Sequence, residues 1–170
     1  DKCNNYVALV PDVVYSGGGK TARGVTGTFT VGTTDMDLCY TAIPVGPTAA
    51  DIAAQYTDNC GGDITVVKTS DLTGDDCSWT ATYSYTVRDK CNNYVASVAD
   101  VVYSGGDKTA PTLTGTYPTG TANMDLCYSA IPAGPTVADI AALYTDNCGG
   151  AITVVKSSVL TGDDCSWTAT

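Results

Sequence analysis

Apolar and polar side chains alternate most regularly along residues 78–88. Trp79, Ala81, Tyr83, Tyr85 and Val87 fall on one face of an extended chain, with mostly smaller polar residues between them. Alternation with a period of two is typical of a β-strand that packs one face against a core. We expect this to be the longest strand and the centre of a sheet. Shorter strands are predicted at 24–30, 37–43, 64–68 and 94–103.

One segment departs from the strand pattern. Residues 46–48, GPT, precede AADIAAQY, in which Ile52, Ala53 and Tyr56 have helical spacing. Pro and Thr are favoured at the start of a helix, so the sequence predicts about two helical turns here. Asp, Asn and Gly gather where the chain must turn. Turns are therefore predicted at 58–62, 74–76 and 89–93.

The sequence repeats itself with a period of 88 residues. DKCNNYVA begins at Asp1 and again at Asp89. Residues 1–82 align with 89–170 without a gap, and 64 of these 82 pairs are identical. A period of this length suits one small β-domain better than a solenoid coil of about 20–45 residues.

Short strands separated by turn signals favour an all-β fold of tandem immunoglobulin-like β-sandwich repeats, each with one short helix. Gly pairs mark the expected linkers, SGGGKTA at 16–22 and SGGDKTAP at 104–111. We expect 1–18 to be the C-terminal strands of a preceding repeat, 19–106 a complete repeat, and 107–170 a repeat lacking its last strands. This phasing predicts either a window on a longer tandem array or a subunit whose first strands complete its neighbour's last repeat.

Composition removes several classes of function. The chain has no His, and all 18 acidic residues are Asp, which against eight Lys and Arg give a net charge of −10. Without His, Ser-His-Asp and Cys-His catalysis cannot operate within the chain, and we expect no enzyme. The negative charge disfavours nucleic acid, because a polyanion needs Lys and Arg to replace its counterions. No apolar run approaches the ~20 residues that cross a bilayer, so we expect no membrane insertion.

Four motifs in order resemble a known family. TDNCGG, GDDCSWT, YTVRDKCNN and VVYSGGDKTAPTLTGTYP, all between residues 57 and 118, are similar to the hyalin-repeat-like, immunoglobulin-like tandem modules of large secreted bacterial surface proteins of the Bacteroidetes type. The likeness spans the whole period, but this chain has DKCNN where such modules often read D-x-C-G-N. The resemblance implies an extracellular tandem array, often found in adhesins and cell-surface proteins, and it implies no catalytic residues.

Each period carries four Cys, spaced 21, 17 and 14 residues apart, without the C-x-x-C pair typical of zinc sites. An even number of Cys in an Asp- and Thr-rich β-chain favours disulfides, and with them a secreted or cell-surface protein. Placing each Cys at one pole of an immunoglobulin-like domain predicts the bonds Cys39–Cys77, Cys60–Cys91 and Cys127–Cys165. Cys3 and Cys148 then lack partners, so we expect them to bond each other between adjacent copies; two free thiols are the alternative.

Asp residues gather in or beside the predicted loops. Short carboxylates and loop carbonyls suit Ca²⁺, which takes about six to eight oxygen ligands, whereas ordinary turn-capping Asp is the alternative interpretation. A linear array would bring Asp37, Asp75 or Asp76, Asp107 and Asp146 around one ion between two domains. The candidate calcium ligands are Asp37, Asp58, Asp75, Asp76, Asp89, Asp107, Asp125, Asp146, Asp163 and Asp164.

The sequence thus favours a structural role. We expect a repeat unit of an extracellular filament, stalk or giant surface protein that propagates head-to-tail through copies of itself, stabilised by disulfides and calcium. The alternative is an adhesin or carbohydrate-binding module, in which Trp79, Trp167 and Tyr residues form a platform for a surface glycan. The placement of both Trp in the middle of alternating strands favours core packing. Near-identical copies also favour the structural class, because a binding tip would tend to differ from its stalk.

Overall fold

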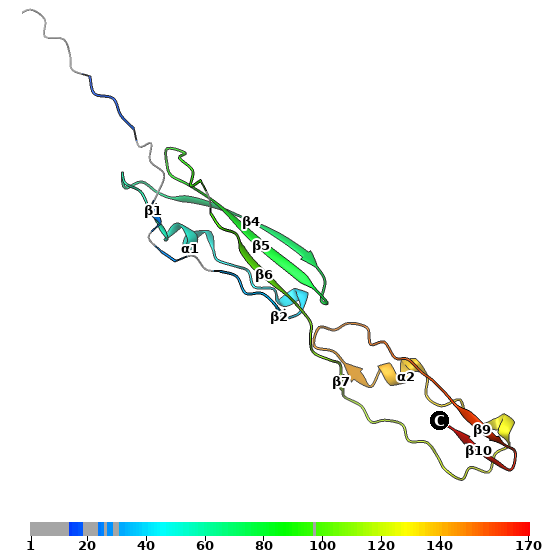
Figure 1. Cartoon of the computed structure of the whole chain (residues 1–170). Coiled ribbons are helices and arrows are strands. Elements are labelled where there is room, and N and C mark those ends of the chain that lie inside the picture. The colour runs from blue at the N-terminus through cyan, green and yellow to red at the C-terminus, as the bar shows by residue number, and fades with distance from the viewer. Residues whose placement is uncertain (1–13, 19–23, 26, 29–30, 97) are drawn as a thin grey trace, which may run out of the picture. The chain divides into compact units, whose positions relative to one another are not determined.

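The protein is mostly β, with a few short helices, as the sequence predicts. Its sheets are separate and do not close on one another. Cys3, most of the segment 1–18 and most of the first predicted linker lie outside the described part of the chain. In the computed structural model the described residues are 14–18, 24–25, 27–28, 31–96 and 98–170 (Figure 1).

The longest strands share one four-stranded sheet, in which β2 pairs with β6 in parallel. The strand order of this sheet is β2-β6-β5-β4, and the other sheets are the antiparallel pairs β1-β3, β7-β8 and β9-β10. Along the chain the elements are β1 (Gly24–Val25), β2 (Met36–Asp37), the 3-10 helix η1 (Tyr40–Ala42), α1 (Ala49–Ala53), β3 (Tyr56–Thr57), β4 (Thr65–Gly74), β5 (Trp79–Arg88), β6 (Val101–Gly106), β7 (Thr112–Leu113), the 3-10 helix η2 (Tyr128–Ala130), α2 (Val137–Ala141), β8 (Tyr144–Thr145), β9 (Leu160–Asp163) and β10 (Ser166–Ala169).

The strand predicted at 78–88 is confirmed as β5, which lies inside its sheet. The predicted inward face is also confirmed, because every second side chain of β5 is buried to 6 % exposure or less. β4 runs to Gly74, well beyond the predicted end at residue 68, because it pairs with β5. The buried side chains of β5 are Trp79, Ala81, Tyr83, Tyr85 and Val87.

Three predicted strands differ from the structure. The strand predicted at 24–30 is confirmed only at Gly24–Val25, because 27–28 are not in a strand and 26 and 29–30 lie outside the described residues. The prediction for 37–43 is wrong beyond residue 37, because the chain turns into η1, where Ala42 N–H donates to the Cys39 carbonyl at 2.9 Å. The prediction for 94–103 is wrong at its start, since Tyr94 forms only an isolated bridge and β6 begins at Val101. β6 then continues to Gly106, so the second predicted linker begins in a strand.

The chain divides into two compact units. The first comprises Asp1–Val31, Gly46–Ser70 and Tyr83–Val101. The second comprises Gly32–Val45, Asp71–Thr82 and Val102–Thr170. β4 and β5 contribute residues to both units.

The predicted helix of the first unit is confirmed as α1, which begins with a reciprocal cap. Asp51 N–H donates to Thr48 Oγ1 at 3.1 Å, and Thr48 N–H donates to Asp51 Oδ2 at 2.8 Å. These hydrogen bonds satisfy backbone donors that a helix start otherwise leaves open. The helix then buries Ile52, and Tyr56 follows in β3 with 4 % of its surface exposed.

The chain enters α1 through a turn that packs against β5. Gly46 has φ +63°, and a Cβ there would lie 2.6 Å from Tyr83 Cδ2. Lys68 Nζ donates to the Gly46 carbonyl at 3.3 Å and lies 4.4 Å from the centre of the Tyr83 ring. Tyr85 Oη donates to the Pro47 carbonyl at 2.8 Å. These contacts fix the approach of the helix to the core of the first unit.

In the second unit, Trp79 is the centre of packing. Its side chain is 1 % exposed, and its Nε1–H donates to the Leu38 carbonyl at 2.8 Å. β6 lies against it without room for a side chain: a Cβ on Gly105 would be 2.3 Å from Met36 O and 2.8 Å from Trp79 Cζ2. The Gly pair that ends β6 therefore lets this strand fit between β2 and β5.

Residues 107–170 of the second unit form η2, α2 and β8, the counterparts of η1, α1 and β3, but contain no buried residue. α2 has the same cap, formed by Thr136 and Asp139. Trp167 Nε1–H donates to the Leu126 carbonyl at 2.9 Å, yet this Trp is partly exposed. Among the described residues of this segment, no strand takes the place that β6 has beside Trp79.

Candidate functional site

A disulfide joins Cys39 to Cys148, residues that are 109 positions apart. Their Cα atoms are 5.2 Å apart, within the usual range of roughly 4.4–6.8 Å. Cys39 is extended and directly precedes η1. Cys148 lies in the turn after β8, where its N–H donates to Asp146 Oδ1 at 2.9 Å. The bond therefore links the first copy of the repeat, residues 19–106, to the second copy, residues 107–170. Both Cys belong to the second compact unit.

This bond corrects the predicted cysteine pairing. Cys39–Cys77 and Cys3–Cys148 are wrong, because Cys39 and Cys148 bond each other. The prediction considered each copy alone, whereas the turn after β8 of the second copy reaches the start of η1 in the first. The predicted bonds Cys60–Cys91 and Cys127–Cys165 are not formed either. The thiols that the structure leaves free, all exposed, are Cys60, Cys77, Cys91, Cys127 and Cys165.

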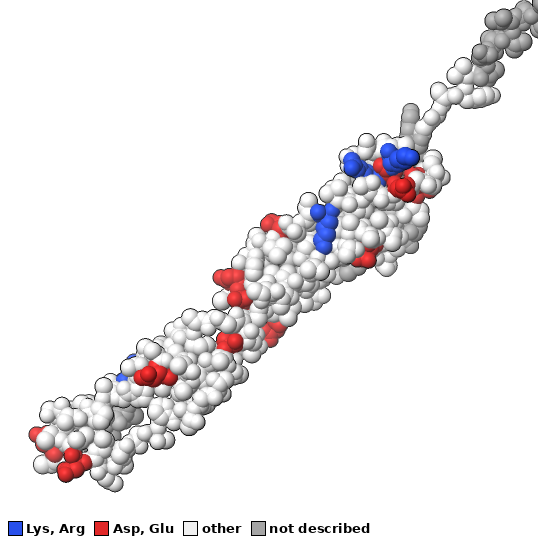
Figure 2. All heavy atoms as spheres, turned by 180° about the vertical axis from the view of Figure 1, so that it is seen from behind, with Lys and Arg blue, Asp and Glu red and all other residues white. Residues whose placement is uncertain are grey.

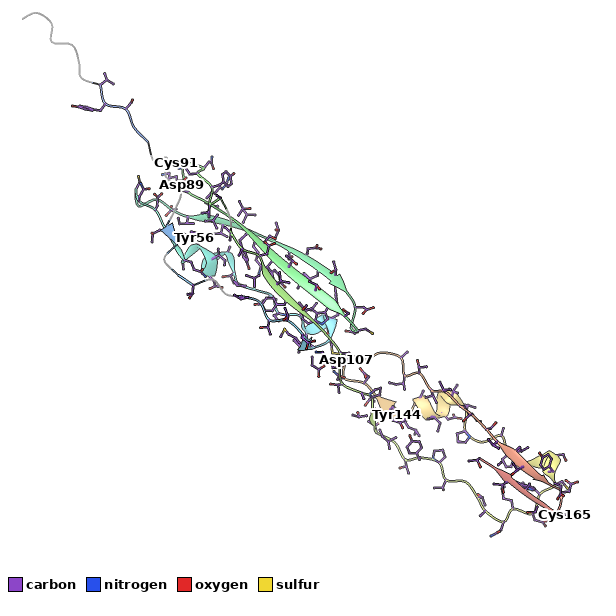
Figure 3. All side chains as sticks on the ribbon, in the orientation of Figure 1. Tyr56, Asp89, Cys91, Asp107, Tyr144 and Cys165 are labelled. Atoms are coloured by element: carbon purple, nitrogen blue, oxygen red, sulfur yellow. A yellow bond between two sulfur atoms is a disulfide. The ribbon has the colours of Figure 1, made fainter. Side chains whose placement is uncertain are left out.

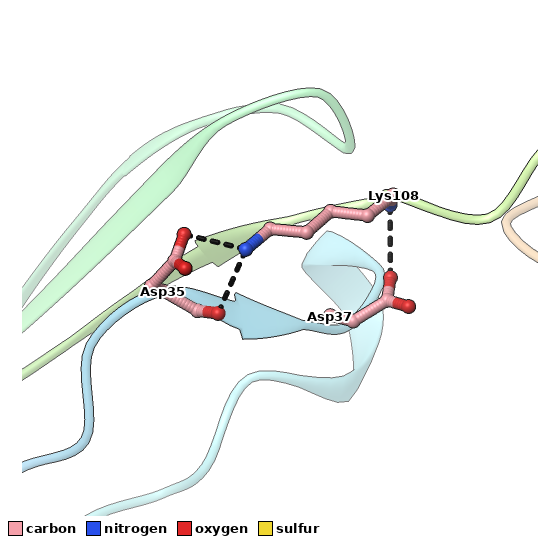
Figure 4. Close-up of polar contacts among 3 residues, drawn as sticks. All are labelled: Asp35, Asp37 and Lys108. Atoms are coloured by element: carbon pink, nitrogen blue, oxygen red, sulfur yellow. Dashed lines mark hydrogen bonds and ion pairs between the residues drawn. The ribbon is translucent and has the colours of Figure 1, made fainter.

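Lys108 holds the start of the second copy against the first (Figure 4). Its Nζ forms an ion pair with the Asp35 carboxylate and donates to the Asp35 carbonyl at 2.9 Å. Its backbone N–H donates to Asp37 Oδ1 at 2.8 Å. Thr109 Oγ1 is 3.2 Å from Asp37 Oδ2. Because Asp35 and Lys108 are 87 % and 45 % exposed, their ion pair contributes about 0.2–1 kcal/mol and mainly sets position.

Acidic side chains surround the disulfide. Carboxylate oxygens of Asp107 and Asp146 lie within 4.8 Å of each other and of Cys148 Sγ. Asp76 forms a second such group with Cys39 and Cys148. The backbone continues this contact, since Asp107 N–H donates to the Asp76 carbonyl at 2.7 Å. These clusters could hold a metal ion, and for a hard cation the ligands would be the carboxylates rather than the disulfide sulfurs.

Each carboxylate of the cluster uses one oxygen to cap the backbone. Asp76 Oδ1 accepts from Tyr40 N–H at 2.7 Å, and Asp107 Oδ1 accepts from Thr109 N–H at 3.0 Å. Asp146 Oδ1 accepts from Cys148 N–H. Among the described residues, none donates a hydrogen bond to the second carboxylate oxygen of any of the three. The cluster thus combines fixed carboxylates with oxygens that still have room for a cation.

Most other candidate calcium ligands form turns instead of gathering at one point. A shared signal explains them: an Asp stands two residues before every one of the eight Cys. Asp89, which is 5 % exposed, is an example, because its Oδ1 accepts from Cys91 N–H at 2.8 Å. Both residues are labelled in Figure 3. Asp37 is held by Lys108 and Thr109, and Asp125 is exposed. The same turn is formed by Asp58, Asp75, Asp146 and Asp163, while Asp164 caps Tyr128 N–H.

A cleft of about 620 Å³ lies beside Trp167. Its walls are residues 120–126 on one side and 164–169 on the other. These segments are the counterparts, 88 positions later, of the chain around β2 and the start of β5, which enclose β6 in the first copy. The cleft therefore corresponds in position to β6. It lies between β10 and residues 124–125, which are the counterpart of β2.

Figure 2 shows Asp side chains at several separate places on the face drawn and Lys or Arg at fewer. Among the described residues, no helix is both long and apolar enough to cross a membrane. Trp79 is core and not part of a glycan platform, as its alternating position predicts.

Comparison of the chain with protein-family models, curated proteins and solved structures finds no match. The resemblance to hyalin-type modules therefore stays a prediction.

Proposed function

We propose that this chain is a structural repeat unit of an extracellular filament, stalk or giant surface protein, built from immunoglobulin-like β-sandwich modules. The observation that carries the proposal is the Cys39–Cys148 bond, because it ties one copy of the repeat covalently to the next. A covalent tie, positioned by the Lys108 contacts, suits a protein that transmits tension along its length. A disulfide also persists in oxidising compartments, which supports an extracellular location. This role requires no catalytic residue.

Copies of the chain associate head-to-tail through the cleft beside Trp167. Its occupant is the segment 13–18 of a second chain, VVYSGG, which has the same sequence as β6. In the free chain Val14 and Tyr15 of this segment are 82 % and 91 % exposed, so they are available to a partner. The added strand would supply backbone partners to β10 and cover Trp167, as β6 covers Trp79.

The Gly pair makes this occupant specific. Gly17 corresponds to Gly105, where a Cβ would collide with Met36 O and the Trp79 ring. The cleft has the same wall residues, Met124 and Trp167, so only a strand with Gly at this position fits. The contact joins two different surfaces, and a contact of this kind propagates instead of closing as a two-fold dimer.

The test follows Trp167 during assembly, in a chain that keeps only the Cys39–Cys148 pair, with Ser at every other Cys. With Trp79→Phe, Trp167 is the only Trp, and under selective excitation of Trp its emission should shift to the blue as protein concentration rises. With Trp167→Phe instead, the buried Trp79 should show no shift. A chain that remains monomeric in sedimentation at all concentrations, with no shift of Trp167 emission, would refute head-to-tail assembly.

Calcium is the proposed ligand of the cluster at Asp107 and Asp146. Two carboxylates so close repel each other, and a divalent cation relieves that repulsion. Added calcium should raise the melting temperature, and Asp107→Asn should abolish the increase. Asp63→Asn is the matched control, because Asp63 is exposed and the second copy has Ala151 in its place. Equal calcium responses in the two variants would refute this site.

A further inference from the structure

The two segments that meet at the Cys39–Cys148 bond each have a counterpart elsewhere in the chain. The Cys residues of these two counterparts are not bonded to each other. Cys127 corresponds to Cys39 and Cys60 corresponds to Cys148, each 88 positions away. Both Cys127 and Cys60 are free and exposed.

Cys127 stands in the same local structure as Cys39. The backbone angles are φ −66°, ψ 153° at Cys127 and φ −63°, ψ 155° at Cys39, and each residue directly precedes a 3-10 helix. The next residue is capped alike: Tyr128 N–H donates to Asp164 Oδ1 at 2.8 Å, as Tyr40 N–H does to Asp76 Oδ1 at 2.7 Å. The Cys127 thiol is therefore positioned by the same contacts that position Cys39 for its bond.

Cys60 likewise lies in a turn of the same form as the turn that contains Cys148. Its N–H donates to Asp58 Oδ1 at 2.9 Å, and Cys148 N–H donates to Asp146 Oδ1 at the same distance. In both turns the following Gly has a positive φ, +71° at Gly61 and +74° at Gly149. The turn that reaches Cys39 in the structure is thus present a second time, with its thiol unbonded.

We infer that Cys127 of one chain and Cys60 of a second chain form an intermolecular disulfide. This inference rests on the proposed function, because strand addition by residues 13–18 brings the repeat that follows them, with Cys60, next to Cys127. The head-to-tail contact is then locked covalently, and the polymer carries the same cysteine bond between chains as within each chain.

The reaction needs an external oxidant of the disulfide class, such as oxidised glutathione. One protein thiolate attacks the oxidant and releases a small thiol, and the second protein thiolate displaces the other small thiol. Overall, two protein S–H bonds are lost, one S–S bond forms, and the oxidant is reduced to two thiols that take up the two protons. Both reacting thiols are accessible, because both Cys are exposed.

The contacts around this bond differ from those at Cys39–Cys148. Asn123 stands where the first copy has Asp35, and Gly19 stands where the second has Asp107. At the bond between chains, the counterpart of Asp35 is therefore uncharged, and the counterpart of the Asp107 carboxylate is missing. We expect the covalent bond to have a larger share in holding chains together than in holding the two copies of one chain.

The test uses the 170-residue chain with Ser at Cys3, Cys77, Cys91 and Cys165, which keeps the native pair plus Cys60 and Cys127. With oxidised glutathione it should give a ladder of integer multiples of the chain mass on a non-reducing gel. Peptide mapping should recover Cys60 linked to Cys127. Adding Cys127→Ser should abolish the ladder, and restoring Cys77 in that variant should not rescue it, although Cys77 is equally a free, exposed thiol.

Three results overturn the inference, in distinguishable ways. In the first, Trp167 becomes buried as concentration rises in the chain with only Cys39 and Cys148, but the test chain yields no Cys60–Cys127 peptide. This result refutes the bond and leaves the proposed function standing. A mixture of like-with-like bonds, Cys60–Cys60 and Cys127–Cys127, refutes the bond as well. No assembly in either chain refutes the bond and the head-to-tail association together.

Discussion

Trp79 and Trp167 make the same hydrogen bond, from indole Nε1–H to the carbonyl of a Leu 41 positions earlier, at 2.8 and 2.9 Å. They differ in burial, since Trp79 is 1 % exposed and Trp167 is only partly buried. The difference comes from β6, which lies beside Trp79 and has no counterpart among the described residues near Trp167. The local contacts of this repeat therefore form without the neighbouring strand, but its core does not.

This difference predicts unequal costs for the same substitution. Trp79→Ala should lower the free energy of unfolding by about 3–5 kcal/mol, the usual range for removing a fully buried Trp. Trp167→Ala should cost clearly less, because that side chain keeps part of its surface in water. Urea denaturation followed by circular dichroism measures both. Equal costs in dilute, monomeric protein would contradict the burial difference.

The proposed strand addition depends on Gly17. No atom lies within 4 Å of the position that a Cβ would take there, so Gly17→Val should leave the free chain as stable as the wild type. It should nevertheless block assembly, because the Val would meet Met124 and Trp167 in the cleft of the partner. Analytical ultracentrifugation compares the variants. Gly150→Val is the matched control, since Gly150 also has open space around its Cβ position and does not line the cleft.

The contrasting substitution is Gly105→Val in β6. There a Cβ would lie 2.3 Å from Met36 O, so the variant should lose stability as a monomer. Loss of assembly by Gly17→Val without loss of monomer stability separates strand donation from a folding defect. Wild-type assembly by Gly17→Val would contradict the proposed fit.

The cap of α1 should respond to acid. Hydrogen bonds from the Thr48 hydroxyl and backbone N–H lower the pKa of Asp51 from its ordinary value of 3.8. The folded chain then binds this proton less tightly than the unfolded chain, so the cap stabilises above pH 3.8 and loses its contribution as the pH falls through the lowered pKa. NMR titration of Asp51 should give a value below 3.8, and Thr48→Ala should raise it. A wild-type value at or above 3.8 would contradict the cap.

The disulfide between the copies should stabilise the second unit. In the chain-entropy account, a bond that closes a loop of about 100 residues contributes roughly 4–5 kcal/mol. Cys39→Ser should therefore lower the urea midpoint of the unit that contains Trp167. Cys77→Ser is the matched control, because Cys77 is a free, exposed thiol. Equal midpoints for the two variants would indicate that the bond contributes no stability.

Local patterns predicted the elements whose residues also determine their packing. The alternation of β5 and the GPT start of α1 correspond to elements of the structure, because side-chain period and capping are set within a few residues. The strand expected at 37–43 did not form beyond residue 37, because a contact distant in sequence decides its structure. Its residues have strand-like composition, but the Asp76 cap on Tyr40 N–H, 36 positions away, favours η1.

The site was predictable in its chemistry and not in its connections. Asp37, Asp75 or Asp76, Asp107 and Asp146 were expected to meet around one ion. Asp76, Asp107 and Asp146 do lie around Cys148, whereas Asp37 contacts Lys108 and Thr109 instead. The cysteine pairing was missed because spacing within one copy carries no information on which loop of the next copy it meets. The Asp-x-Cys pattern, present at all eight Cys, was the available signal that most of these carboxylates form turns.

Peptide mapping of the unreduced protein tests the central claim, the covalent bond between successive copies, most directly. Free thiols are first blocked with an alkylating agent, and the chain is then digested and its linked peptides identified by mass spectrometry. The account predicts a peptide containing Cys39 bound to one containing Cys148. Recovery of Cys39 bound to Cys77, with Cys148 alkylated, would contradict it.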